Sequence, residues 1–340
     1  VAGVQNLSGV VPDNSTTLRL AANSTINDNA SLSVGTLDLA NFALTLDDNM
    51  SRLSIAQPVT LDAAGEKIVT GAADLTLNGG ISATAGTLSS TGGMVSALNL
   101  SAGAAGIINF QGGALSLPSG ATFVSGSTFT TSNTTLNLGG SLAVAGTWSG
   151  SNTTSISLTT DNASLSSTVP LSLASLQTNG HDFELASATT DLTIENAFAL
   201  SGSETLSTRG ADLIFESSAD ISPGSTLDAS GTDNSSGGGK PILEFQLGGT
   251  GNGTINARNA IFKIGSAYAV PGTLKTNSST TWDLVSNLDL SGGTLELGGN
   301  VVLDKVLTDN LTTFKLGEDA TVTRNQGFTL GDLDLDNSTF

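Results

Sequence analysis

The chain has 340 residues and carries 30 acidic against 11 basic side chains, a net charge of −19 that repels nucleic-acid phosphates and anionic lipid surfaces. It has no cysteine, so its folded state must depend on a core and on backbone hydrogen bonds. No run approaches the roughly 20 apolar residues of a membrane helix. We therefore expect no nucleic acid among its partners and no membrane insertion of this segment. Charged residues make up 12% of the chain and hydrophobic residues 38%, which predicts a folded rather than a disordered protein.

Short apolar–polar–apolar units recur along the whole chain. Alternation with a period of two indicates short strands with one face buried and one face exposed. No segment repeats apolar residues at helical spacing over three turns, so we expect almost no helix. In chain order, the units are Leu18–Leu20, Leu37–Leu39, Leu44–Leu46, Leu53–Ile55, Val59–Leu61, Leu75–Leu77, Leu98–Leu100, Leu115–Leu117, Leu136–Leu138, Ile156–Leu158, Leu171–Leu173, Phe183–Leu185, Leu192–Ile194, Leu213–Phe215, Leu243–Phe245, Ile261–Ile264, Trp282–Leu284, Leu288–Leu290, Leu295–Leu297, Val301–Leu303, Phe314–Leu316, Phe328–Leu330 and Leu333–Leu335.

The spacing of these units predicts a repeat. The midpoints Thr76, Asn99, Ser116, Asn137 and Ser157 follow one another at intervals of about 20 residues. Such a period is typical of a solenoid, and the chain lacks the fixed Asn and the L-x-x-L-x-L frame of leucine-rich repeats. We therefore predict an all-β fold, a parallel β-helix (β-solenoid) of roughly 20 residues per coil, in which residues 1–340 form a single domain.

The segment NLDLSGGTLELGGNVVLD, residues 287–304, indicates how a coil is built. The pattern predicts that Leu295 and Leu297 point into a narrow core and that Glu296 points outward. Glycine and asparagine then occupy corners that require a positive φ.

One segment interrupts the pattern. Residues 228–240 include SGTDNSSGGG, which offers no inward-facing side chain, so we expect a protruding loop there. The alternative interpretation is a hinge between two sub-rods.

Several stretches resemble the β-helical shafts of large exported bacterial surface proteins. These stretches are GGALSLPSGATF (112–123), TTLNLGGSLAVAGTWSG (134–150) and SGGTLELGGNVVLD (291–304). The likeness is to filamentous-haemagglutinin-like adhesins and autotransporter passengers. It implies a right-handed parallel β-helix, export to the outside of the cell, and a role in adhesion or surface structure.

Polysaccharide cleavage is a common activity of β-helices, and the sequence lacks its signatures. Pectin hydrolases of this fold combine Asp residues with a G-H-G and an R-I-K motif. Here Asp47 and Asp48 are adjacent, but the single histidine, His181, is followed by Asp182, and no R-x-K triplet is present. The arginines are far apart in sequence, and none has an evident acidic cluster around it. We therefore expect no enzyme activity and no catalytic residues.

The sequence also indicates no cofactor and no metal-binding residues. The segment GGTGNGTIN (248–256) is similar to a Ca²⁺-binding nonapeptide, but Gly253 stands at its essential Asp position. The alternative is Ca²⁺ held between stacked outward carboxylates, because aligned like charges repel unless a cation separates them. The acids at such outward positions are Asp38, Asp289, Glu296 and Asp334, with Asp332 and Asp336 on the same face as Asp334.

Two polar patterns remain open to more than one interpretation. The N-x-S/T sequons suit either solenoid corners or a glycosylated surface protein. They begin at Asn6, Asn14, Asn23, Asn29, Asn49, Asn99, Asn133, Asn152, Asn162, Asn234, Asn252, Asn277, Asn310 and Asn337. Threonine pairs such as Thr128–Thr130 and Thr321–Thr323 are too isolated to form the regular face of an ice-binding solenoid.

The sequence therefore favours a non-enzymatic, secreted or cell-surface structural protein, the β-solenoid shaft of an adhesin or self-assembling surface filament. The alternative is a polysaccharide-binding or polysaccharide-cleaving β-helix such as a tailspike. An outer groove with clustered Asp, aromatic and basic side chains would favour that alternative. The partners we expect are host or surface glycans and a covering for the end coils near Val1 and Phe340. That covering is either a second copy stacked end to end or further coils of a longer chain.

Overall fold

A computed structural model describes residues 1–5, 13–27, 31–47, 52–161, 163–231, 239–325, 327–336 and 338–339. These residues form short parallel strands and one turn of 3₁₀-helix, η1 (Ser151–Thr153). The strands build about 15 stacked turns of about 21 residues each. The predicted all-β solenoid with almost no helix is thus confirmed, and its right-handed sense stays a prediction. Among the described residues, no helix is long and apolar enough to cross a bilayer.

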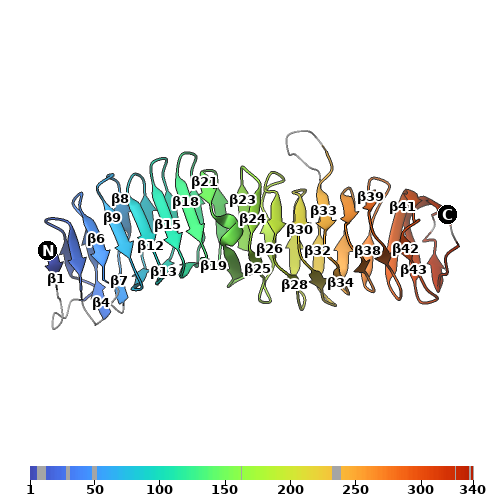
Figure 1. The fold of residues 1–340 in the computed structure, drawn as a ribbon, viewed down its shortest axis with the longest axis horizontal. Helices are drawn as coiled ribbons and strands as arrows, with labels where there is room; N and C mark the ends of the chain where they lie inside the picture. The colour runs from blue at the N-terminus through green and yellow to red at the C-terminus, as the bar shows by residue number, and fades with distance from the viewer. Residues whose placement is uncertain are drawn as a thin grey trace. The chain divides into compact units, whose positions relative to one another are not determined.

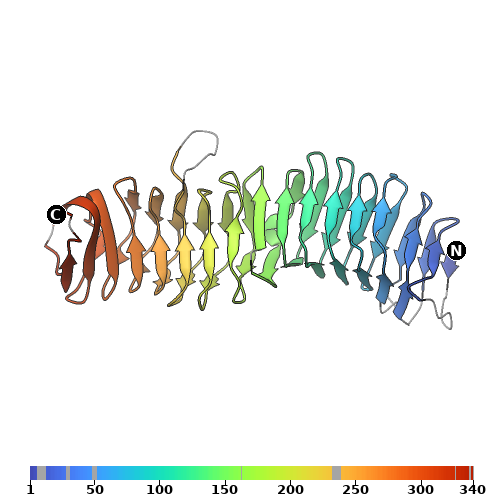
Figure 2. The same ribbon diagram turned by 180° about the vertical axis from the view of Figure 1, so that it is seen from behind.

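The chain divides into two compact units, residues 1–163 and 164–340, each of which is a stack of coils. The expectation that 1–340 form a single domain stays a prediction. Figures 1 and 2 show that, within each unit, strands of successive coils lie side by side on both faces.

The first unit has three ladders of parallel strands. One contains β1 (Gly3–Gln5), β3 (Ser24–Ile26), β6 (Ala43–Leu46), β9 (Lys67–Thr70), β12 (Thr87–Ser90), β15 (Ile107–Gln111), β18 (Thr128–Ser132) and β21 (Thr147–Ser149). The second contains β4 (Ser31–Val34), β7 (Arg52–Ile55), β10 (Asp74–Leu77), β13 (Met94–Ala97), β16 (Ala114–Leu117), β19 (Thr135–Leu138) and β22 (Ser155–Leu158). The third contains β8 (Val59–Leu61), β11 (Ile81–Ala83), β14 (Leu100–Ala102), β17 (Ala121–Phe123) and β20 (Ser141–Val144), and a separate pair is formed by β2 (Thr17–Arg19) and β5 (Thr36–Asp38).

The second unit also has three ladders, named here by one strand each. The β41 ladder contains β23 (Ala163–Ser167), β26 (Phe183–Leu185), β29 (Thr205–Ser207), β32 (Thr226–Asp228), β35 (Thr254–Asn256), β38 (Thr273–Lys275), β41 (Thr294–Val302), β43 (Thr313–Thr323) and β44 (Asp332–Asp334). The β39 ladder contains β24 (Leu171–Leu173), β27 (Leu192–Ile194), β30 (Leu213–Phe215), β33 (Ile242–Phe245), β36 (Ile261–Ile264) and β39 (Thr281–Leu284). The β40 ladder contains β28 (Phe198–Leu200), β31 (Ala219–Ile221), β34 (Gly249–Gly251), β37 (Tyr268–Ala269), β40 (Leu288–Asp289) and β42 (Val306–Leu307), and β25 (Ser175–Gln177) precedes β26.

Equivalent residues of successive coils lie directly over one another. Leu75 pairs with Val95, Val95 with Leu115, Leu115 with Leu136, and Leu136 with Ile156. Each pair is in register across neighbouring parallel strands, which are about 4.8 Å apart. The apolar–polar–apolar pattern therefore produces continuous inward rows of Leu, Val and Ile and continuous outward rows of polar residues.

The core takes up most of the large apolar and aromatic side chains. Phe215 stacks on Phe245 of the next coil with ring centroids 5.2 Å apart, and Phe198 lies 5.0 Å from Phe215. Burial of each such side chain stabilises the fold by roughly 1.5–3 kcal/mol. The fully buried aromatic residues are Phe110, Phe123, Phe129, Phe183, Phe198, Phe215, Phe245, Phe262, Phe314 and Tyr268.

Four predicted units differ from the structure. Leu98 is 45% exposed because β13 ends at Ala97 and the chain turns before β14 begins. Residues 328–330 form no strand. Leu333 in β44 and Leu335 beyond it are exposed, because among the described residues only β43 pairs with β44. The unit 282–284 is in a strand but is only half-buried, for a reason given below.

Other strands lack the Leu-x-Leu signature because a small or hydroxyl residue faces inward. Thr131 in β18 is buried, and its Oγ1 accepts a hydrogen bond of 2.8 Å from Trp148 Nε1. Ser90 in β12 and Gly251 in β34 are buried as well. Periodicity of apolar residues alone cannot find such strands.

The predicted loop at 228–240 falls in a coil that is longer than its neighbours. Leu213 pairs with Leu243, so this coil spans 30 residues, whereas Leu192 and Leu213 are 21 residues apart. Residues 232–238, which carry most of the predicted loop, lie outside the described part of the chain.

Candidate functional site

The outward face of the β41 ladder carries charges of alternating sign. Successive strands place Lys275 beside Glu296, Glu296 beside Lys315, and Lys315 beside Asp334. Lys315 Nζ lies 3.8 Å from a carboxylate oxygen of Asp334. Opposite charges at neighbouring outward positions attract, so this row stabilises the stacking of the coils.

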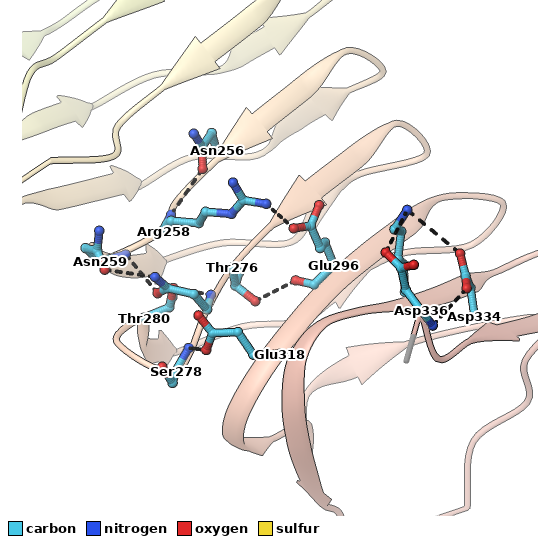
Figure 3. Close-up of polar contacts among 12 residues, drawn as sticks. Asn256, Arg258, Asn259, Thr276, Ser278, Thr280, Glu296, Glu318, Asp334 and Asp336 are labelled. Carbon is cyan, nitrogen blue, oxygen red and sulfur yellow. Dashed lines mark hydrogen bonds and ion pairs between the residues drawn. The ribbon is translucent and has the colours of Figure 1, made fainter. Parts of the chain in front are cut away.

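An arginine adds to this row from a neighbouring corner. Figure 3 shows the Arg258 guanidinium extending to the carboxylate of Glu296, with which it forms an ion pair. The Glu296 side chain is 14% exposed, and the backbone carbonyl of Glu296 accepts a hydrogen bond from Thr276 Oγ1 at 2.8 Å. Glu296 thus points outward, as predicted, but it is well enclosed by its partners.

The same corner contains a second polar cluster (Figure 3). Asn277 Nδ2 donates to Asn259 Oδ1 at 2.8 Å, and Glu318 accepts a hydrogen bond from the backbone N–H of Ser278 at 3.1 Å. The first contact joins successive coils, and the second joins coils on either side of the β41 coil. We interpret them as a stabilising corner, since each polar group already has a partner within the chain.

Four of the arginines each have one acidic partner, and in none of these ion pairs does the arginine meet a cluster of acids. Arginines and acids that are distant in sequence meet because the coils stack. The ion pairs are Arg19–Asp38, Arg52–Asp74, Arg209–Glu184 and Arg258–Glu296. Arg324 instead lies over the ring of Phe328, 5.6 Å from its centroid.

The stacked row of carboxylates does not form among the acids singled out for it. Asp38 lies in β5 beside Arg19, Asp289 lies in the β40 ladder, and Lys315 separates Glu296 from Asp334. In the described ranges, no group of three or more His, Asp or Glu side chains could hold a metal ion. That the protein has no cofactor stays a prediction.

The residues weighed for catalysis are distributed over both units. Asp47 belongs to the first unit, and Asp48 lies outside the described residues. His181 is half-buried in the second unit at a tight turn, where its N–H donates to Thr178 O at 3.0 Å and Asn179 and Gly180 have positive φ. The Asn-Gly pair thus forms a corner of the kind that requires a positive φ.

The segment 248–256 forms part of an ordinary coil. It contains β34 and β35, and Gly253 lies in the turn between them, where its N–H donates to Ile221 O at 2.9 Å. A side chain at this position would meet the backbone oxygen of Ser222 at 2.4 Å. Glycine is therefore required here for packing.

The sequons that the structure describes lie at the surface. Only Asn277 among them is half-buried, in its pair with Asn259. The exposed ones are Asn14, Asn23, Asn99, Asn133, Asn152, Asn252 and Asn310. Asn6, Asn29, Asn49, Asn162, Asn234 and Asn337 lie outside the described residues.

Two buried glutamates were not singled out from the sequence. The Glu66 carboxylate accepts hydrogen bonds from the backbone N–H groups of Asn41, Asp62 and Ala63. Glu204 is 2% exposed, and its carboxylate likewise accepts hydrogen bonds from backbone N–H groups at its own corner. Both carboxylates satisfy donors of turns on two coils, which is a structural role.

A hollow of the second unit lies beside the edge strand β39. Among the described strands of the β39 ladder, β39 has a neighbour only on the side of β36. In the described part of the chain the following coil forms no strand pair with β39, and its strand β41 has a β-bulge or similar irregularity at Gly298 and Gly299, where its register with β43 shifts and the strand bends. Gly299 has φ +72°, and a Cβ there would lie 2.6 Å from Ser278 Cα. This bend leaves the 282–284 unit half-buried and opens a groove.

We call this hollow the Trp282 groove. Strand β39 contributes Thr281, Trp282 and Leu284, and Lys240, Ser278 and Thr280 lie next to them. The end of β41 and the turn after it contribute Asn300, Val302, Asp304 and Lys305. The groove has a volume of about 500 Å³.

The groove combines an aromatic side chain with two lysines that form hydrogen bonds but no ion pair among the described residues. Lys240 Nζ donates to Thr281 Oγ1 at 2.8 Å, and Lys305 Nζ donates to the carbonyls of Leu284 and Val285 at 2.7 Å. Neither ammonium has a carboxylate within 4.0 Å among the described residues. Such a combination of aromatic, acidic and basic side chains is the feature that favours carbohydrate recognition over a plain shaft.

Sequence reasoning missed this groove because it treated Trp282–Leu284 as one more buried unit. A tryptophan among units built mainly from Leu, Ile and Val was an available signal, as was the Gly-Gly pair at 298–299. The position of Lys240 and Lys305 beside that tryptophan depends on coil stacking.

Comparison with known proteins does not place the chain in a family: no family model, no curated protein and no solved structure matches it.

Proposed function

We propose that this protein is a non-enzymatic extracellular structural protein, the β-solenoid shaft of an adhesin or of a self-assembling surface filament. The observation that carries the proposal is the division of residues between the two faces of each strand. Aromatic and large apolar side chains fill the core, while outward rows such as Lys275–Glu296–Lys315 alternate in charge, and Glu296 and Lys315 form ion pairs with Arg258 and Asp334. A stack of this kind extends by adding coils and requires no reactive centre.

Secretion to the cell surface is part of the same proposal. The absence of cysteine and the excess of hydroxyl and amide residues suit an exported solenoid whose stability comes from repetition rather than from cross-links. As partners we propose surface glycans, together with a second copy stacked end to end or further coils of a longer chain. End-to-end stacking is a heterologous contact that does not close, so it would produce a filament.

Negative-stain images of the native material test the shaft. We expect fibres or long projections, in which antibodies to the second unit label the surface of intact cells. Discrete compact particles that release sugars from a polysaccharide would overturn the proposal.

The alternative, a polysaccharide-binding or polysaccharide-cleaving β-helix, is favoured by one observation, the Trp282 groove. Its side chains suit binding, and they lead to the inference below.

A further inference from the structure

We propose that the Trp282 groove binds a short glycan that carries a single carboxylate-bearing sugar. This inference rests on the surface-glycan partner proposed above, for which it names the sugar class and the site, and it holds or fails independently of filament formation.

The volume of the groove suits a small ligand. At about 500 Å³ it lies within the range of roughly 300–1,000 Å³ that is usual for ligand pockets. Its lining includes Thr281, Ser278 and Asn300, whose hydroxyl and amide groups are exposed and able to pair with sugar hydroxyls.

The aromatic side chain presents carbon to the groove. Trp282 is half-buried, but its Nε1 atom is fully buried, so the accessible part of the indole consists of carbon atoms. Val302, which is 56% exposed, and the half-buried Leu284 extend this apolar area. Sugar rings expose C–H faces that pack on such a surface, as apolar groups do on aromatic rings in general.

The indole N–H has no hydrogen-bond partner among the described residues. Buried polar groups in native proteins nearly always have partners, and the exceptions concentrate at functional sites. The Trp282 ring packs edge to face against Phe262, with ring centroids 5.8 Å apart. The ring is thus anchored by the core on one side while its donor stays unsatisfied.

The charges of the groove specify an anionic group. Lys240 and Lys305 supply two positive charges, while Asp304 is engaged by Asn325, whose side-chain amide donates to it at 2.7 Å. One ligand carboxylate would balance the remaining positive charge and form charge-assisted hydrogen bonds with the ammonium groups. A polyanion is disfavoured because the protein as a whole has a net charge of −19.

Calorimetric titration of the full chain tests the proposal, with sialyllactose, which has one carboxylate, as the probe and lactose, which has none, as its control. We expect sialyllactose to bind, to change the tryptophan fluorescence, and to bind at least about tenfold more tightly than lactose. The second tryptophan, Trp148, is buried in the first unit and bonded to Thr131, so the fluorescence change reports on Trp282. Binding should weaken at about 0.5 M salt, since exposed charge pairs are screened.

Substitutions locate the site. Lys240→Ala, alone and combined with Lys305→Ala, should weaken sialyllactose binding by about tenfold or more. Lys67→Ala removes the same charge from an exposed position in the first unit and should change nothing. The Lys305 ammonium also bonds to backbone carbonyls, so its removal can destabilise the fold. Within the described chain, Lys240 bonds only to a threonine hydroxyl, and the single variant Lys240→Ala therefore decides the test if the double variant unfolds.

Three results would overturn the inference. They are the absence of sialyllactose binding, equal affinity for lactose, and equal loss of affinity in Lys67→Ala and Lys240→Ala. None of them bears on whether the protein forms filaments.

Discussion

Arg258 and Glu296 form an ion pair although 38 residues separate them in the chain, because the stacking of the coils brings them together across the intervening β38 coil (Figure 3). The pair lies at the side of an outward row in which Glu296 also has Lys275 and Lys315 as neighbours. An outward glutamate, which the sequence alone presents as an interchangeable surface residue, is here paired with an arginine and flanked by a lysine on each neighbouring strand.

We therefore expect Glu296→Ala to lower the free energy of unfolding by about 1–2 kcal/mol, more than an unpaired surface residue would. A surface residue without such partners would change it by no more than about 0.5 kcal/mol. Chemical denaturation followed by circular dichroism measures the loss. Exposed Glu216→Ala is the matched control, and equal small losses for both variants would show that the pair contributes nothing.

Leu297 is fully buried one residue away from Glu296. Leu297→Asp places a charge in the packed core and should cost about 3 kcal/mol or more. The exposed Leu311, at 69%, offers the matched change Leu311→Asp, which should stay within about 0.5 kcal/mol. Comparable melting temperatures for the two variants would mean that the inward facing of Leu297 is wrong.

The buried carboxylate of Glu204 holds a corner together. It accepts hydrogen bonds from Thr178 Oγ1 at 2.6 Å, from the N–H of Ser201 at 3.0 Å and from the N–H of Gly180. Glu204→Ala leaves these donors without their acceptor and should lower the free energy of unfolding by about 3 kcal/mol. Hydrogen exchange at Gly180 and Ser201 should accelerate in the variant, and unchanged exchange would contradict this role.

Asp309 links acid pH to stability. Hydrogen bonds from the N–H groups of Gly292 and Leu311 and from the Thr312 hydroxyl lower the pKa of the Asp309 carboxyl. A group whose pKa is lower in the folded state contributes stability that is present above its unfolded pKa and is lost as the pH falls through the folded pKa. The melting temperature of Asp309→Asn should thus lie below that of the parent at neutral pH, and the two should converge below about pH 4. A difference that does not change with pH would exclude this linkage.

Gly299 and Gly292 separate two effects of a side chain at positive φ. Both have φ above +70°, but a Cβ at Gly292 meets no atom within 4 Å, whereas one at Gly299 would lie 2.6 Å from Ser278 Cα. Gly292→Ala should cost about 1–2 kcal/mol from backbone strain alone. Gly299→Ala should cost clearly more in the same unfolding assay, and it should alter the fluorescence of Trp282 because the bend shapes the groove. Equal costs would mean that the chain relaxes at the contact.

The sequence by itself determined the fold class and most of the core. Pairs such as Leu75 and Leu77 alternate with polar residues, and an alternation of period two is compatible only with strands that bury one face. Its recurrence about every 20 residues then indicates stacked coils, because a single short unit cannot bury its own apolar face. The same rule predicted that Leu295 and Leu297 point inward and Glu296 outward, and this prediction is confirmed.

Only the tertiary structure decided which outward residues meet. The acids Glu296 and Asp334 alternate with Lys315 rather than stacking on one another, because the number of residues in each coil sets the register and that number varies. For the same reason Lys240, Trp282 and Lys305 meet in one groove: a bend at Gly298–Gly299 diverts one coil from the next, and this bend depends on the fit of Gly299 against Ser278. Inward positions follow from the local alternation and can be predicted along the chain. Which outward residues of different coils become neighbours depends on the number of residues in every coil that lies between them.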